Sequence, residues 1–351
     1  MKAMDPAGAE KVSFTSAKSF MLVLLAALAV GFTSGCQSAA NRQVPGRPLS
    51  APAAERNWPR AFVDDLGQRA VLPRPPRRVV SLSPNMTEIT CFVGAEEVLV
   101  GVTDFCDYPP SVVGKPKVGG IINASFEKIL ALAPDLVLAA QGNDLLLLNK
   151  LRQHGVPVYA AKPKTLENVF ALISTVGKLL GRETAADAAL KSLRARAQAL
   201  QETASHLASR PRVLVVIEVD PLFVAGPGSF IDDLLRRAGL VNVVSEGQAW
   251  TRWSSERLIA ADPDLVILAA AHEINGSSAR RLKSLSPWRE LRAVRQGTVY
   301  EVSDDALTIP GPRLVDGLAN LVDVHSQYEK RSRAAPASRS AERQRSRGTR
   351  I

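Results

Sequence analysis

Residues 126–139 read F-E-K-I-L-A-L-A-P-D-L-V-L-A, and residues 255–268 read S-E-R-L-I-A-A-D-P-D-L-V-I-L. The two stretches align without gaps, and each carries a glutamate near its start and Pro-Asp-Leu-Val near its end. Each predicts a short amphipathic helix that stops at the proline, because proline cannot continue a helix and disfavours the α conformation of the residue before it. An apolar strand follows. The repeat therefore predicts two similar α/β lobes with a cleft between them.

Strand and helix signals alternate on both sides of the middle of the chain, which predicts parallel sheets covered by helices on both faces. From Leu166 to about Leu207, apolar residues recur at spacings of three and four, which predicts a long helix between the lobes, with Gly181-Arg182 as the place where it could kink. The expected fold is α/β, with two Rossmann-like lobes whose parallel sheets are joined by a long backbone helix. Such a joint should hinge less than a loop. Strands are expected at 78–82, 98–103, 135–140, 156–160, 212–217, 264–269 and 298–302, with a hairpin at 62–72 and a helix at 230–238 capped by Ser229.

The N-terminal region has the organisation of a secretory signal peptide. Residues 19–32 form an apolar run too short to span a bilayer stably, with lysines before it and Thr33-Ser34-Gly35-Cys36 after it. Small residues ending in cysteine resemble a bacterial lipobox, in which Cys36 would be diacylated and become the mature N-terminus. Ordinary cleavage to a soluble secreted form is the alternative. Either route predicts export across the cytoplasmic membrane, to the periplasm for the lipid-anchored form.

Most of the net charge of +10 lies in the last 22 residues, where eight Lys and Arg residues accompany one glutamate. Few apolar residues occur there, so we expect a disordered, solvated basic tail. Weak attachment to anionic lipid or polymer is the alternative. The body of the chain, at about +3, gives no reason to expect nucleic-acid binding. The predicted division of the chain is 1–36 signal peptide, 37–57 tether, 58–165 N-terminal lobe, 166–208 backbone helix, 209–328 C-terminal lobe and 329–351 tail.

Two cysteines, Cys91 and Cys106, remain in the first lobe once Cys36 is set apart. An oxidising compartment would allow a disulfide between them, although the sequence alone does not show whether their Cβ atoms lie close enough to form one.

Catalytic and metal-binding signatures are absent from the sequence. No His/Cys cluster has zinc spacing, and no nucleophile elbow or phosphate-binding loop occurs. Residues 226–229 are glycine-rich but lack the lysine of a P-loop. His272 follows the strand at 264–269, where α/β sheets bind ligands, although an ordinary loop histidine explains it as well. An enzyme acting in the interlobe cleft is thus a minor alternative, and we expect neither a metal nor a cofactor.

Two further segments, together with the two Glu…Pro-Asp-Leu-Val copies, make the pattern specific: 78–88 (RVVSLSPNMTE) and 101–110 (GVTDFCDYPP). In order and spacing, over about residues 60–328, the chain resembles the helical-backbone (class III) substrate-binding proteins of ABC importers, and most closely their cobalamin-binding branch. The resemblance implies a monomeric, non-enzymatic protein that holds a corrinoid between its lobes and delivers it to the transmembrane permease subunits. Haem or an iron–siderophore is the alternative ligand. A surface adhesion or sensor protein that reuses the fold is the alternative role.

The resemblance also implies a set of ligand-binding residues. Aromatic faces would cover the corrin, while amides and loop backbone groups would meet its carboxamides. Core packing is the competing explanation for Phe223 and Trp250. One departure stands out: the cobalamin binders carry a tryptophan after the strand at 135–140, where this chain has Gln141-Gly142-Asn143-Asp144. The implied residues are Pro84, Asn85, Phe105, Tyr108, Phe223, Trp250, Ile274, Asn275, Gly276 and Asp304.

The repeated glutamates, Glu127 and Glu256, have a local explanation, because an acidic residue in the first helical turn interacts favourably with the helix dipole. The resemblance gives them a second role. In this class, one glutamate on each lobe docks onto arginines of the permease, and two carboxylates matched to two guanidinium groups would fix the orientation of docking.

Overall fold

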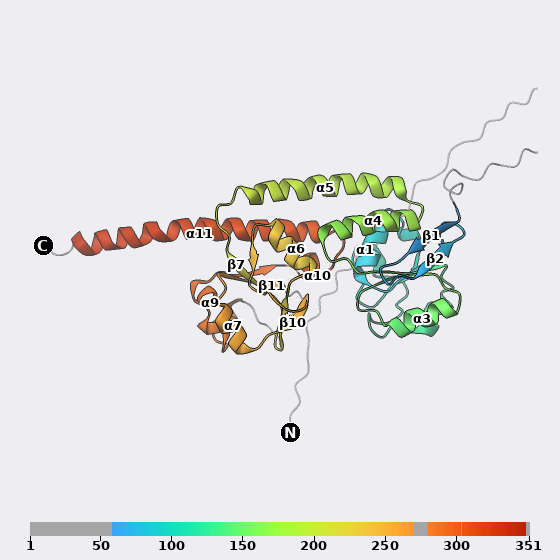
Figure 1. Ribbon diagram of the computed structural model, residues 1–351, viewed down its shortest axis with the longest axis horizontal. Coiled ribbons are helices and arrows are strands. Elements are labelled where there is room, and N and C mark those ends of the chain that lie inside the picture. Colours follow the sequence, from blue (N-terminus) through green and yellow to red (C-terminus); the bar gives the residue numbers. More distant parts are fainter. Residues whose placement is uncertain (1–57, 270–278, 303, 349–351) are drawn as a thin grey trace, which may run out of the picture. The chain divides into compact units, whose positions relative to one another are not determined.

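The computed structural model describes residues 58–269, 279–302 and 304–348 (Figure 1). A four-stranded parallel sheet lies in the first lobe, with the strand order β4-β3-β5-β6. Helices α1, α2 and α3 alternate with these strands along the chain. The elements are β3 (Val79–Ser81), α1 (Pro84–Phe92), β4 (Leu99–Gly101), α2 (Phe126–Ala131), β5 (Leu136–Ala140), α3 (Leu145–Gln153) and β6 (Val158–Ala161), with 3₁₀ turns at Glu96–Val98 and Pro110–Val112.

The expected hairpin precedes this sheet, as β1 (Arg60–Val63) paired antiparallel with β2 (Arg69–Leu72). Asp64 holds its turn, because its carboxylate accepts from the backbone N–H groups of Leu66 and Gln68. The same carboxylate binds Arg152 of α3 at 2.8 Å, which fixes the hairpin to the lobe.

The second lobe contains a six-stranded mixed sheet. Strands β9, β7, β11 and β12 are parallel, whereas β8 and β10, which the sequence analysis did not assign, add antiparallel to one edge. Ser229 caps α6 as predicted, since its hydroxyl accepts from Asp232 N at 3.1 Å. The elements are β7 (Arg212–Val219), β8 (Leu222–Ala225), α6 (Phe230–Arg237), β9 (Val241–Asn242), β10 (Trp250–Arg252), α7 (Ser255–Ala261), β11 (Leu265–Ala269), α8 (Ala279–Leu282), a 3₁₀ turn (Trp288–Glu290), α9 (Arg292–Gln296), β12 (Val299–Val302), α10 (Asp304–Thr308) and α11 (Leu314–Gly348).

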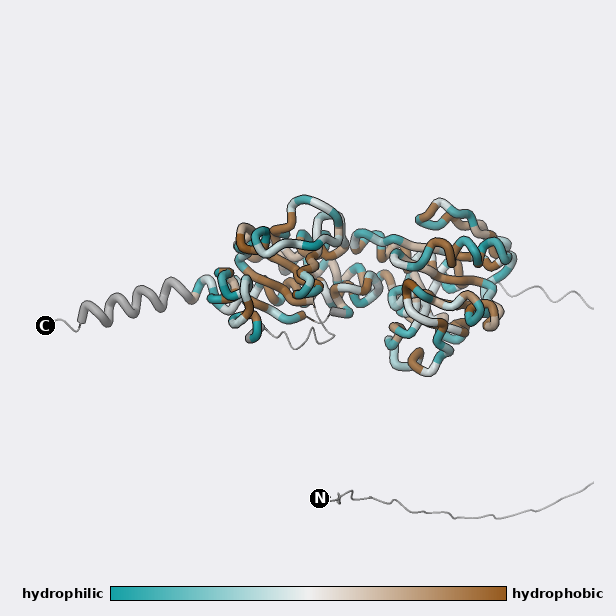
Figure 2. The backbone as a smooth tube through the Cα atoms, turned by 90° about the horizontal axis from the view of Figure 1, so that it is seen from below, coloured by the Kyte–Doolittle hydropathy of each residue, from teal (hydrophilic) through white to brown (hydrophobic). Residues whose placement is uncertain are grey.

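Alternation of side chains along the central strands buries both faces of each sheet. Leu136 and Leu138 of β5 join one apolar cluster, while Val137 joins another on the opposite face. Strand β11 repeats this with Ile267 and Val266. Figure 2 shows the resulting apolar segments inside each lobe, with hydrophilic segments around them.

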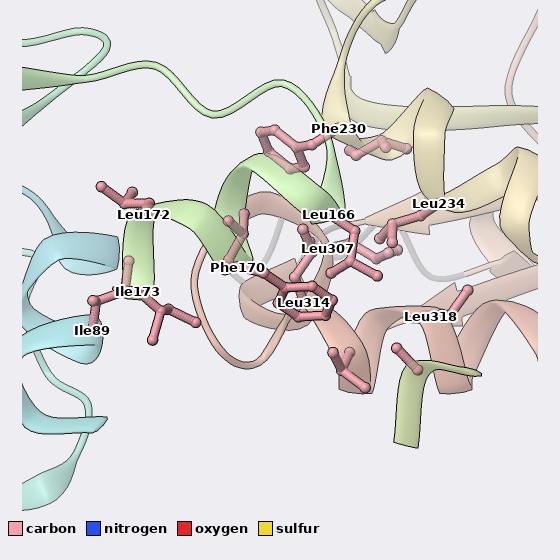
Figure 3. Packing of buried hydrophobic residues seen from close by; sticks show 14 of the residues in the cluster. Ile89, Leu166, Phe170, Leu172, Ile173, Phe230, Leu234, Leu307, Leu314 and Leu318 are labelled. Carbon is pink, nitrogen blue, oxygen red and sulfur yellow. The ribbon is translucent and has the colours of Figure 1, made fainter. Parts of the chain in front are cut away.

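One of these clusters contains residues of both lobes. Phe170 and Ile173 of α4 pack there with Ile89 of α1, Leu234 of α6 and Leu314 of α11 (Figure 3). The two lobes are therefore connected through a common apolar core.

The connection between the lobes differs from the single helix that was predicted. Helix α4 (Leu166–Leu179) ends at a turn, and α5 (Glu183–Ser205) returns alongside it (Figure 1). Gly181 has φ 66°, a left-handed conformation that glycine adopts at little cost, and it ends the first helix. Close packing of the pair requires Gly177, because a Cβ there would lie 2.5 Å from Ala186 Cβ. Helix α5 also packs on α11, so two helices rather than one brace the lobes.

The repeated Pro-Asp pairs do more than end a helix. Asp135 accepts from the backbone N–H of Arg78 at 2.9 Å and donates its own N–H to Arg78 O, just before β3. Asp264 forms the same two bonds, each 2.8 Å, with Arg212 at the start of β7. Each aspartate thus fastens its strand to the neighbouring strand of the same sheet.

The C-terminal region also differs from expectation. Helix α11 runs to Gly348, so the segment 329–348 is helical rather than disordered. Alanine and arginine favour helix, whose backbone hydrogen bonds are local and need no apolar core. The predicted signal peptide, Cys36 and the tether lie outside the described residues. Within the described part of the chain, no helix has the length and apolar character needed to cross a membrane.

Candidate ligand-binding cleft

A cleft of about 1000 Å³ lies between the two sheets, lined by residues of both lobes. Most lining residues of the first lobe follow the carboxyl ends of its parallel strands, where open α/β sheets generally bind ligands. The lining comprises Ser83, Pro84, Asn85, Asp104, Phe105, Asp107, Ile121, Ile122, Ala140, Gln141, Gly142, Pro163, Phe223, Phe230, Trp250, Asp305, Thr308, Ile309 and Pro310.

Aromatic side chains form the wall on the second lobe. Antiparallel pairing of β8 with β10 places Phe223 and Trp250 on adjacent strands, and both are half-buried. Phe230 packs edge-to-face on Trp250, with ring centroids 5.3 Å apart. Phe223 and Trp250 are therefore not wholly core residues, because each also presents a surface to the cleft.

The first lobe contributes exposed apolar groups from two loops. Phe105 is 56% exposed and Ile122 is 76% exposed, and because both line the cleft they form an apolar surface within it. Asn143 holds the adjoining loops together, because its amide nitrogen donates to Leu82 O and Ile121 O, both at 2.8 Å. The cobalamin binders carry a tryptophan in the segment 141–143. In this chain Asn143 supports the neighbouring loops, while Gln141 and Gly142 line the cleft.

Asn85 supplies a polar group at the floor of the cleft. Only 3% of the residue is exposed, and its Oδ1 accepts from Ser83 Oγ at 2.7 Å. Its amide nitrogen is buried without a hydrogen-bond partner among the described residues. A buried donor left without an acceptor costs about 1–3 kcal/mol.

An ion pair near the cleft connects the lobes. Arg313, just before α11, binds Glu88 of α1 through Nη2–Oε1 at 2.6 Å and Nε–Oε2 at 3.1 Å, and Asp305 of α10 through Nη1–Oδ2 at 2.9 Å. Burial raises the pKa of Glu88 above its usual value, although the bonds from Arg313 pull it down. Burial alone would lower the pKa of Arg313, but its bonds to Glu88 and Asp305 raise it overall.

Tyr108 lies outside the main cleft, in contrast to the implied role. Its ring packs under the Arg313 guanidinium at 4.2 Å and lines a neighbouring cavity of about 390 Å³ on the other side of the ion pair. Of the other implied residues, Pro84, Asn85, Phe105, Phe223 and Trp250 line the cleft. Asp304 begins α10, next to the lining residue Asp305. His272, Ile274, Asn275 and Gly276 lie outside the described residues.

The disulfide that the sequence allowed is not formed, and both cysteines are free. The buried Cys106 Sγ contacts the hydroxyls of Thr87 and Thr103, each at 3.1 Å, so this thiol is engaged with hydroxyls instead. Cys91 is half-buried, and desolvation raises its pKa to about 12.

Glu127 and Glu256 occupy matching, exposed positions at the starts of α2 and α7. In both helices a serine two residues earlier caps the helix: Ser125 accepts from Lys128 N at 3.2 Å, and Ser254 from Arg257 N at 3.3 Å. Each glutamate follows within six residues of a cleft-lining side chain, Ile122 or Trp250. The pKa of Glu127 is lowered by its own backbone N–H and by Ser125, and that of Glu256 by Ser254 and its own backbone N–H.

Several lining residues were missed from the sequence. Ile121 and Ile122 carried a usable signal, as an apolar pair between two glycines and an asparagine in a loop. Asp104, Asp107, Phe230 and the segment 308–310 carried none, because only the packing of the lobes brings them to one place. Among the described residues, no group of three or more His, Cys, Asp or Glu side chains is arranged to hold a metal ion.

Comparison with known proteins agrees with this architecture. The periplasmic binding protein family matches residues 79–306, and the chain belongs to this family. An uncharacterised ABC transporter substrate-binding lipoprotein of Bacillus subtilis, YvrC, is 28% identical over 303 residues, which cover 84% of this chain and 93% of that protein.

Two solved structures of other proteins align with this chain over nearly their whole length. The periplasmic vitamin B12 binding protein BtuF of Vibrio cholerae is 26% identical, with a TM-score of 0.66 over 73% of this chain and 99% of its own. The periplasmic haem-binding protein RhuT from Roseiflexus sp. RS-1, in its apo form, is 26% identical, with a TM-score of 0.67 over 72% of this chain and 99% of its own. The predicted two-lobed α/β fold and its family resemblance are thereby confirmed.

Proposed function

We propose that this protein is the substrate-binding component of an ABC importer, which captures a corrinoid, most simply cobalamin, in the interlobe cleft and delivers it to the permease. The observation that carries the proposal is the cleft itself, with aromatic side chains on one wall and exposed apolar loops on the other. Its volume lies at the top of the range of about 300–1,000 Å³ for small-molecule sites, as a large, rigid ligand requires. The vitamin B12 binder among the similar structures supports the same ligand.

The role is binding rather than catalysis. Flat aromatic and apolar surfaces cover a macrocycle without reacting with it. Capture by a monomer suffices, because both walls come from one chain. We further propose that Cys36 carries a lipid anchor that holds the protein at the periplasmic side of the membrane.

Delivery rests on Glu127 and Glu256. Both carboxylates are exposed and held by their helix caps, and both lie close in sequence to the cleft wall. Arginines on the two permease subunits would bind them through paired hydrogen bonds and set the cleft over the translocation path.

The test is uptake of cyanocobalamin by cells that depend on this protein. Glu127→Ala/Glu256→Ala should leave binding by the purified protein unchanged and reduce uptake about tenfold or more, since charged pairs at interfaces are worth several kcal/mol. Glu167→Ala/Glu202→Ala, which removes two exposed glutamates of α4 and α5, is the matched control and should transport normally. Undiminished uptake by the first double variant would exclude the docking role.

A further inference from the structure

All charged side chains that line the described part of the cleft have the same sign. Asp104, Asp107 and Asp305 face it, and no lysine, arginine or histidine is present among the described lining residues. Asp305 is bound to Arg313. The carboxylates of Asp104 and Asp107 are exposed and form no hydrogen bond or salt bridge with another described residue. They are therefore acceptors open to a ligand, because an ionised carboxylate cannot donate.

The loop that carries these two carboxylates is held from behind. Lys117 Nζ donates to Cys106 O at 2.8 Å and to Thr103 O at 3.3 Å, so this cation binds the backbone of the loop. Arg313, which packs on the neighbouring Tyr108 ring, is bound to Glu88 and Asp305. The buried Cys106 side chain contacts Thr87 and Thr103. Asp104 and Asp107 thus flank the exposed Phe105 in sequence, on a loop whose backbone is held in place, and such pre-organisation lowers the entropy cost of binding.

Asn85 provides the complementary group. Its buried amide nitrogen lacks a partner among the described residues, so this lining residue is a candidate donor to a ligand oxygen where the loop offers acceptors. A primary carboxamide satisfies both, because its N–H groups can be accepted by the carboxylates and its carbonyl oxygen can accept from Asn85. A carboxylate satisfies only the donor, and it would face Asp104 and Asp107 as a like charge.

We infer that the cleft selects ligands by the chemistry of their periphery: Asp104, Asp107 and Asn85 accept a macrocycle edged with carboxamides and reject one edged with carboxylates. The inference rests on the proposed binding function and sharpens it. A corrinoid, whose ring carries carboxamides, fits this rule, whereas haem, with its propionates, does not. Specificity here comes from repulsion of the wrong ligand as much as from attraction of the right one.

The test compares ligands that differ by one group. Cyanocobalamin and its monocarboxylate isomers, in which one ring carboxamide is hydrolysed, have the same shape and differ by one charge. At low salt, we expect wild-type protein to bind the parent about tenfold or more tightly than at least one isomer, since like charges in an interface are strongly disfavoured. Asp104→Asn/Asp107→Asn should reduce this ratio to below about threefold. Asp187→Asn/Glu290→Gln, which removes two exposed carboxylates elsewhere, should leave it unchanged.

A second ligand pair keeps the two proposals apart. An iron porphyrin diacid and its bis-carboxamide should show the same preference for the amide, and the same loss of preference in Asp104→Asn/Asp107→Asn. If no corrinoid binds while the amide porphyrin is preferred, the corrinoid proposal fails and the peripheral-group inference stands. Equal affinities within every pair that binds, or ratios unaffected by the aspartate changes, would overturn the inference. Asn85→Asp should weaken binding of the parent by about tenfold, because it replaces the donor with a third acceptor.

Discussion

Arg313 of the second lobe binds Glu88 of the first through two nitrogens, at 2.6 and 3.1 Å, across 225 residues of sequence. A bidentate guanidinium–carboxylate pair fixes orientation as well as distance. Together with the shared apolar core along α4, the pair explains how two separate sheets hold a defined cleft between them.

Breaking this pair should destabilise the whole fold. Glu88→Ala leaves the Arg313 guanidinium without its main partner, and loss of one member of a buried pair costs about 3–5 kcal/mol. Because Arg313 is 19% exposed, we expect about 3 kcal/mol, or a fall in Tm of roughly 6–12 °C. Differential scanning calorimetry measures this fall in Tm.

Glu167→Gln is the control, since it breaks the exposed Arg194–Glu167 pair between α4 and α5 and should cost less than about 1 kcal/mol. Equal effects of the two changes would show that the interlobe pair has no special role.

The repeated aspartates should contribute to stability in both lobes. Asp135→Ala removes two backbone-to-carboxylate bonds, from Arg77 and Arg78, and Asp264→Ala removes bonds from Arg212 and the Arg292 side chain. We expect each to lower the free energy of unfolding by about 1–3 kcal/mol, because each change removes two hydrogen bonds that are worth about 0.5–1.5 kcal/mol apiece. Urea denaturation checks this. The exposed Asp187→Ala should change it by less than about 0.5 kcal/mol. If Asp135→Ala and Asp264→Ala lowered the free energy of unfolding no more than Asp187→Ala does, the hydrogen bonds of these two aspartates would not stabilise the fold.

Glu127 and Glu256, the proposed docking residues, should titrate at unusually low pH. Both pKa values are lowered from 4.5 in the folded state, so their favourable contribution is present above 4.5 and disappears as the pH falls through the lowered folded values. Ser254→Ala should raise the pKa of Glu256 more than Ser125→Ala raises that of Glu127, because the serine is the main cause for Glu256 and the backbone N–H for Glu127. Carboxyl NMR titration measures each value. Midpoints at or above 4.5 in the wild-type protein would contradict the hydrogen-bonded caps.

The duplicated stretch predicted much of the fold, because its signals are local. A glutamate in a first turn, a proline stop and an apolar strand depend on neighbours in sequence, and the structure places α2–β5 and α7–β11 there. Even the residues before the prolines match, since Ala133 and Asp262 both have positive φ. The clamps made by Asp135 and Asp264 escaped prediction because their partners lie more than 50 residues away.

Prediction of the site was limited for the same reason. Residues in aromatic or strand-end contexts, such as Phe105 and Trp250, could be named from the family pattern and do line the cleft. Tyr108 was misplaced because its environment depends on Arg313, which comes from the other lobe. The backbone was predicted as one helix with a kink at most at Gly181-Arg182, because apolar spacing alone does not distinguish a kink from a full turn, whereas the positive φ of Gly181 turns the chain back.

Isothermal titration of the purified protein with cyanocobalamin, haemin and a ferric siderophore tests the central claim most directly. Capture of a corrinoid predicts a saturable one-to-one isotherm with cyanocobalamin and none with the two iron chelates. Saturable binding of haemin or the siderophore, with no heat from cyanocobalamin, would contradict it.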